Sequence, residues 1–210
     1  MHLTLAQALH RGVAAHNEGN LHDAEECYRA ILKSHKKKPA GNQALNLIAQ
    51  CYINLGILLH GKKDLAESIN CYRGALKIRP DLIEIYWLKG LAHRDVGDLK
   101  RSVDCYQQAV KLEPNNADAW NNLGAAQQHK GDLEGSIQSY REALKIDPAC
   151  VEAYNNMGGA LQALGDTGAA LESYKGSTPF SRTVIKRLKT LNRSWQLFAA
   201  FEDCGIAQCS

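Results

Sequence analysis

The chain has 210 residues, of which 45% are hydrophobic and 22% charged, so its composition argues against extensive disorder. A formal net charge of +3 is too small to predict nucleic-acid binding. No apolar run approaches 18 residues and the N-terminus lacks the features of a signal peptide, so the sequence predicts neither membrane insertion nor secretion.

A repeat of 34 residues organises most of the chain. It carries an aromatic residue, a glycine four residues later, and a tyrosine sixteen residues after that glycine. A more divergent unit with Gly12 and Tyr28 opens the chain. The aromatic and glycine positions are then filled by Tyr52 and Gly56, Tyr86 and Gly90, Trp120 and Gly124, and Tyr154 and Gly158.

The repeats predict a domain organisation in chain order. Residues 1–35 form a divergent first repeat and 36–48 a basic connector or insertion. Residues 49–82, 83–116 and 117–150 form complete repeats, 151–176 an incomplete one, and 177–210 a basic amphipathic capping helix and tail.

Each repeat predicts two helices, as the fourth shows. Its first helix should run from about Ala117 to Lys130 and end at Gly131 in the left-handed conformation. Asp132 should cap the second helix. Gly124 lies inside the first helix at a cost of about 1 kcal/mol relative to Ala, which indicates close approach of the partner helix. The equivalent caps are Asn20, Asp64, Asp98 and Asp166.

These units resemble tetratricopeptide repeats over roughly residues 5 to 175, most fully in Trp120, Leu123, Gly124, Tyr140 and Pro148. The resemblance implies an all-α fold, a right-handed superhelical solenoid of about five helix-turn-helix repeats with a C-terminal capping helix. It also implies a concave groove, lined by the first helices, that binds a peptide segment of a partner protein.

The same resemblance suggests which side chains face the groove, namely those just after the aromatic position and one turn later. Trp87 is the sharpest candidate, as a binding hot spot, although it could instead pack beneath the connector or the chain's end. The expected apolar half comprises Ile53, Ile57, Trp87, Leu88 and Leu91, with Asn54 beside it. The expected amide half comprises Asn121, Asn122, Gln128, Asn155, Asn156 and Gln162.

Asn54, Asn122 and Asn156 share one repeat position, interrupted by Leu88, and would form a partial amide ladder able to pair with a peptide backbone. This ladder is similar to the asparagine-lined repeat arm of O-linked N-acetylglucosamine transferases. Helix-surface amides are also ordinary solvated residues, so both interpretations stay open.

The last 35 residues leave the repeat pattern. Val184, Leu188, Leu191 and Trp195 share a helical face, whereas the other face is basic. A helix that covers the exposed end of the solenoid is the first interpretation. A basic helix that contacts anionic lipid, calmodulin or an acidic partner is the second, and a truncated or alternatively spliced end the third.

No catalytic, metal or cofactor motif is present, so the sequence predicts a protein that is not an enzyme. The seven cysteines include no C-x-x-C pair and their number is odd, which favours reduced thiols in the cytoplasm or nucleus. The leading hypothesis is a non-catalytic scaffold that binds a protein or peptide partner. The alternatives are a substrate-recruiting arm of a larger enzyme such as a glycosyltransferase, and a membrane-surface adaptor using the basic C-terminal helix. The oligomeric state is left open.

Overall fold

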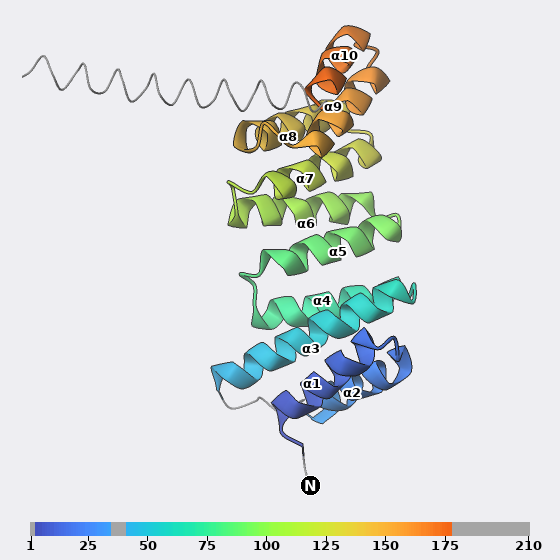
Figure 1. The fold of residues 1–210 in the computed structure, drawn as a ribbon, viewed down its shortest axis with the longest axis vertical. Coiled ribbons are helices and arrows are strands. Elements are labelled where there is room, and N and C mark those ends of the chain that lie inside the picture. The colour runs from blue at the N-terminus through green and yellow to red at the C-terminus, as the bar shows by residue number, and fades with distance from the viewer. Residues whose placement is uncertain (1–2, 35–40, 178–210) are drawn as a thin grey trace, which may run out of the picture. The chain divides into compact units, whose positions relative to one another are not determined.

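The computed structural model describes residues 3–34 and 41–177, and the regular structure in this part of the chain is entirely α-helical (Figure 1). The helices form two compact units, which divide after Pro114. The N-terminal unit contains α1 (Leu5–Asn17), α2 (Leu21–Ser34), α3 (Asn42–Gly61), α4 (Leu65–Ile78), α5 (Ile83–Asp95) and α6 (Leu99–Leu112). The C-terminal unit contains α7 (Ala117–Lys130), α8 (Leu133–Ile146), α9 (Val151–Ala163) and α10 (Thr167–Gly176).

Within each unit the helices pair in chain order, and successive pairs stack on one another. The first helix of a pair packs on the second helix of the preceding pair, as α3 does on α2 and α9 on α8. First helices also contact each other, α1 with α3, α3 with α5, and α7 with α9. The predicted all-α stack of helix pairs is therefore confirmed.

The polar residue before each second helix caps it as predicted. The Asp132 side chain accepts a hydrogen bond of 3.0 Å from the Gly135 backbone N–H, which satisfies a donor that the helix cannot pair internally. Gly131, at φ 89°, ends the preceding helix α7 in the left-handed conformation. The equivalent caps are Asn20, Asp64, Asp98 and Asp166.

A glycine of each first helix receives the tyrosine ring of its partner helix. A Cβ atom on Gly124 would lie 2.6 Å from Cε1 of Tyr140, a fully buried residue, so no side chain fits between them. We call this the glycine–tyrosine contact. It recurs in every described pair, as Gly12–Tyr28, Gly56–Tyr72, Gly90–Tyr106, Gly124–Tyr140 and Gly158–Tyr174.

The predicted connector at residues 36–48 differs from the structure in its second half. Helix α3 begins at Asn42 and is 20 residues long, so residues 42–48 are helical. Ile48 is buried and Leu47 packs against the core around Tyr28, because the apolar pattern of α3 extends upstream of the repeat. The predicted capping helix and tail at 177–210 lie, apart from Ser177, outside the described residues.

Helix α3 is also long and apolar enough to cross a membrane by length and composition, although the sequence predicted no such segment. This is weak evidence for a span, because the core helix of a soluble protein passes the same test. Eight residues of α3 are buried, and the helix packs against α1, α2, α4 and α5.

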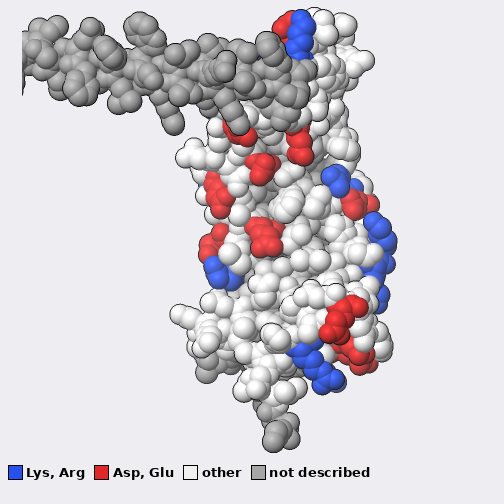
Figure 2. Space-filling model, in the orientation of Figure 1, with Lys and Arg blue, Asp and Glu red and all other residues white. Residues whose placement is uncertain are grey.

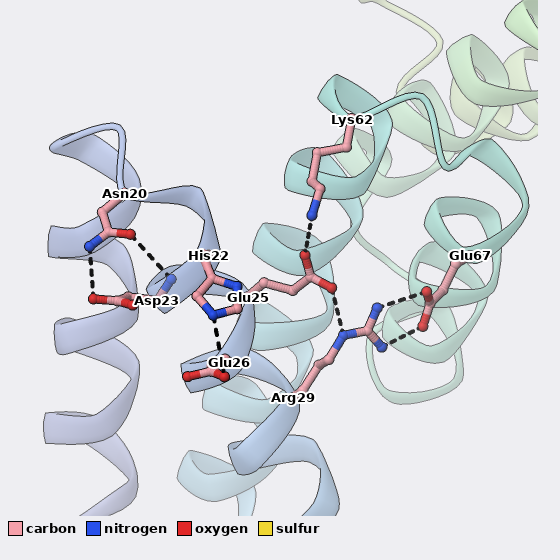
Figure 3. Close-up of polar contacts among 8 residues, drawn as sticks. All are labelled: Asn20, His22, Asp23, Glu25, Glu26, Arg29, Lys62 and Glu67. Carbon is pink, nitrogen blue, oxygen red and sulfur yellow. Dashed lines mark hydrogen bonds and ion pairs between the residues drawn. The ribbon is translucent and has the colours of Figure 1, made fainter.

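A network of charged side chains joins the first helix pair to the second, and the sequence analysis did not anticipate it (Figure 3). Arg29 of α2 donates two hydrogen bonds to the Glu67 carboxylate of α4, at 2.5 and 2.7 Å. Glu25 accepts from Arg29 Nε at 2.8 Å and from Lys62 Nζ at 2.6 Å. The hydrogen bond from Lys62 and then that from Arg29 lower the pKa of Glu25, and the bond from Arg29 lowers that of Glu67.

Replacing Gly124 tests the glycine–tyrosine contact. Overpacking costs about 1–3 kcal/mol, so G124A should lower the free energy of unfolding despite the better helix propensity of Ala. Gly159 is the matched control, because its Cβ would meet no atom closer than 3.7 Å. G159A should leave stability unchanged or raise it by up to about 1 kcal/mol in urea denaturation. Equal effects of the two changes would contradict this account.

The ion network predicts a pH-dependent loss of stability in R29Q. Because folding lowers both carboxyl pKa values, the stabilisation is present above the usual carboxyl pKa and disappears as the pH falls through the lowered values. Arg29 and Glu67 are each more than a third exposed, so we expect only about 1 kcal/mol at pH 7. The difference from wild type should shrink below about pH 4 in denaturation curves. K145Q, which removes a surface ion pair within α8, is the control and should change the free energy of unfolding by no more than about 0.5 kcal/mol at either pH.

Candidate peptide-binding surface

The twelve candidate residues lie on first helices, six in each unit, and they differ in exposure and in hydrogen bonding. In the N-terminal unit, Trp87 is 44% exposed and Ile57 38% exposed, whereas Leu88 and Leu91 are half-buried. We call Ile57, Trp87, Leu88 and Leu91 the apolar patch. It is contributed by α3 and α5, which contact each other.

Ile53 was expected to face the groove and is instead buried. It belongs to the core cluster that also contains Tyr72 and Ile85, and Leu88 of the following first helix packs against that cluster. The position after the aromatic residue is therefore buried in α3 but exposed to solvent in α5, where Trp87 occupies it. Asn54, the next residue along α3, is half-buried and accepts a 2.9 Å hydrogen bond from Gln50 Nε2.

Charged groups accompany the apolar patch on α5. The exposed Glu84 precedes Trp87 by three residues and Leu88 by four, which places it on the same side of the helix. At the other end of α5, Asp95 Oδ2 lies 2.9 Å from His60 Nε2 of α3. This hydrogen bond and a smaller contribution from Arg94 lower the pKa of Asp95 against the opposing effect of burial. The pair joins the C-terminal ends of α3 and α5.

In the C-terminal unit, most of the candidate amides already have partners within the fold. Asn121 is only 6% exposed, contrary to expectation, because α9 packs against α7. Its Oδ1 accepts a 3.1 Å hydrogen bond from Asn156 Nδ2. Gln128 Oε1 accepts from the Tyr140 hydroxyl at 2.8 Å, and Gln162 Oε1 from the Tyr174 hydroxyl at 3.3 Å. Asn122 is half-buried and Asn155 is exposed.

The three members of the predicted amide ladder are therefore not equivalent. Asn54 and Asn156 each make a hydrogen bond inside their own unit, and no side-chain bond is found for Asn122 among the described residues. A primary amide offers two donors and an acceptor with two lone pairs, so one internal bond does not exhaust it. The internal bonds fix the orientation of Asn54 and Asn156, whereas Asn122 lacks that restraint.

The described thiols are unpaired and mostly buried. Burial raises the pKa of Cys51 to about 12 and that of Cys71 to about 11, which keeps both protonated and unreactive. Among the described residues, one group has ligand atoms close enough for a metal ion, namely His22, Asp23 and Glu26, and all three are exposed (Figure 3). Asp23 accepts a hydrogen bond from Asn20, and His22 lies 3.5 Å from Glu26, so the group is satisfied within α2 and its cap.

Comparison with protein-family models decides the family. Models described as "Tetratricopeptide repeat" match residues 88–149 and 151–178, and one described as "TPR repeat" matches residues 56–97. Together these matches cover more than half of the chain. The chain belongs to the tetratricopeptide repeat family. Membership supports a protein-binding role and an interaction fold for this chain.

Solved structures of other proteins show the same fold. A crystal structure of MamA aligns with a TM-score of 0.70 and 19% identity over 89% of this tetratricopeptide repeat chain and 99% of that one. MamA from Desulfovibrio magneticus RS-1, from residue 41 to its end, aligns with a TM-score of 0.71 and 19% identity, covering 85% of this chain and 96% of that one. No curated protein matches the sequence.

The amide pair between α7 and α9 gives a testable difference between two asparagines. N156A should lower the free energy of unfolding by about 1–3 kcal/mol, because it leaves the buried Asn121 oxygen without its donor. N122A, one repeat earlier at the same position, should change stability by no more than about 0.5 kcal/mol. Chemical denaturation of both variants measures the difference. A large loss in N122A would show that Asn122 is also structural.

Proposed function

We propose that this protein is a non-catalytic scaffold that binds an extended or helical segment of a partner protein on α3 and α5 of its N-terminal unit. The family supports a protein-binding role, and the apolar patch supports its location. Trp87 is the observation that carries the proposal. It is 44% exposed, although its neighbour Tyr86 is half-buried and donates a hydrogen bond to the Pro80 carbonyl.

Formation of helix α5 does not require an exposed tryptophan at position 87. Ala92 follows Ile85 by seven positions, about two turns, so both lie on one face of α5, and both are buried. Trp87 follows Ile85 by two residues, about 200° around the helix, so it points away from that buried face. Tryptophan is enriched among residues that contribute most of the binding energy at interfaces, and it buries a large apolar area on docking.

Glu84 gives the apolar patch a preference for the charge of its partner. A carboxylate one turn before Trp87 favours a partner that carries a basic residue beside its apolar anchor. It disfavours recognition of a partner's C-terminal carboxylate, for which some family members use cations at the positions held here by Glu84 and Leu88. We also propose a cytosolic or nuclear location, supported by the unpaired buried thiols of Cys51, Cys71 and Cys105.

Substitution of Trp87 tests the proposal. A partner is first identified by affinity capture and mass spectrometry, and its segment is then titrated against the full chain. W87A should weaken binding at least about tenfold, because hot-spot residues typically contribute 2 kcal/mol or more. The far-ultraviolet circular dichroism should stay unchanged.

L112A is the matched control, because Leu112 of α6 is also 44% exposed but lies on a second helix. Its affinity should equal that of the wild type. If W87A binds as tightly as L112A while both remain folded, the apolar patch is not the binding surface.

A further inference from the structure

The last described helix leaves a core position uncovered. Leu171 of α10 occupies the repeat position held by Ile69, Val103 and Ile137, which are only 5–8% exposed, yet Leu171 is 55% exposed. Ile137 shows what normally covers this position, since it shares a cluster with Ala160 and Leu161 of the following first helix α9. No described helix follows α10. Tyr174, half-buried where Tyr140 is fully buried, reflects the same open face.

The sequence beyond Ser177 carries apolar residues in the register needed to cover this face. One repeat length after α9 corresponds to residues 185–197. Leu188, Leu191 and Trp195 then stand where α9 has Tyr154, Met157 and Leu161. Leu161 is buried against α8 and α10, and Met157 packs against the same cluster. The following segment therefore repeats the apolar pattern of a first helix.

The same register shows where this segment departs from a first helix. Asn192 stands at the position of Gly12, Gly56, Gly90, Gly124 and Gly158. That glycine is needed because the tyrosine of the partner second helix lies against it. A segment with Asn at this position lacks the glycine–tyrosine contact and so cannot receive a second helix in the manner of the described repeats. Its apolar pattern therefore fits packing on the preceding second helix, but not pairing with a following second helix.

Charge favours the same pairing. Acidic residues outnumber basic ones by eight to four between residues 115 and 177, whereas basic residues outnumber acidic ones by five to two between residues 178 and 210. Figure 2 shows acidic side chains on the visible face of the C-terminal unit. The segment is joined directly to α10, so it reaches the open face at high effective concentration.

We propose that residues 184–198 dock on the outer face of α10, over Leu171 and Tyr174, in place of a further first helix. The occupant of this face is thus the chain's own C-terminal segment. Leu188, Leu191 and Trp195 face α10, and the basic residues between Arg182 and Arg193 remain on the outer side. The proposal is independent of peptide binding at the apolar patch.

Limited trypsin digestion of the full chain, read by mass spectrometry, tests this docking. Trypsin cleaves after Arg182, Lys186, Arg187, Lys189 and Arg193. These sites should be cleaved at least about tenfold more slowly in the chain than in a synthetic peptide of residues 178–210, because cleavage follows the undocked population. L171D changes the face and L188D changes the segment, and each should remove the protection. L112D, on α6 of the N-terminal unit, should retain it.

Four outcomes would overturn the proposal. The chain and the peptide could be cleaved equally fast, or both L171D and L188D could leave protection intact while their helical circular dichroism equals that of the wild type. Protection that disappears on dilution, together with a dimer in sedimentation, would assign the face to a second copy. Protection that arises only with phosphatidylserine vesicles would assign the segment to membranes.

Discussion

Each helix pair depends on a tyrosine ring lying directly against a glycine of its partner helix. At Gly124 the ring of Tyr140 fills the space that a β-carbon would take. The two helices therefore approach more closely than any residue other than glycine at this position would allow. This contact holds the two helices of a pair together. In α5 a different face, which carries Ile85 and Ala92, is buried against α3 and α4 of the preceding pair, and Trp87 lies outside that buried face.

Features that depend on one helix pair could be predicted from the sequence at the level of single residues. The caps, the left-handed Gly131, the bounds of α7 and the close approach at Gly124 all follow from local chemistry. The burial of Ile53 and Asn121 could not be predicted, because it depends on Leu88 and Asn156 one repeat later. The network of Arg29 and Glu67 was missed for the same reason, since its residues are 38 positions apart and follow no motif.

The two units use the same repeat positions for different chemistry. The position after the aromatic residue is a core isoleucine in α3, an exposed tryptophan in α5, a buried asparagine in α7 and an exposed asparagine in α9. The helix pairs accommodate all four residues, and in α3 and α7 the following first helix of the same unit buries this position. A single scaffold geometry therefore provides an apolar surface in one unit and a largely self-satisfied amide cluster in the other. This difference is the reason for proposing the binding surface on the N-terminal unit.

The glycine–tyrosine contact also constrains how such a chain can change over time. Enlarging the glycine alone collides with the ring, and shrinking the ring alone leaves a cavity beside the glycine, so either single step passes through a weakened protein. These sites can therefore change mainly when the glycine and the tyrosine are replaced together. Duplication of a whole helix pair is the other route, because it copies both residues at once. Trp87 is exposed and not held by a contact of this kind, so the side chain at this position can change while the stack stays the same.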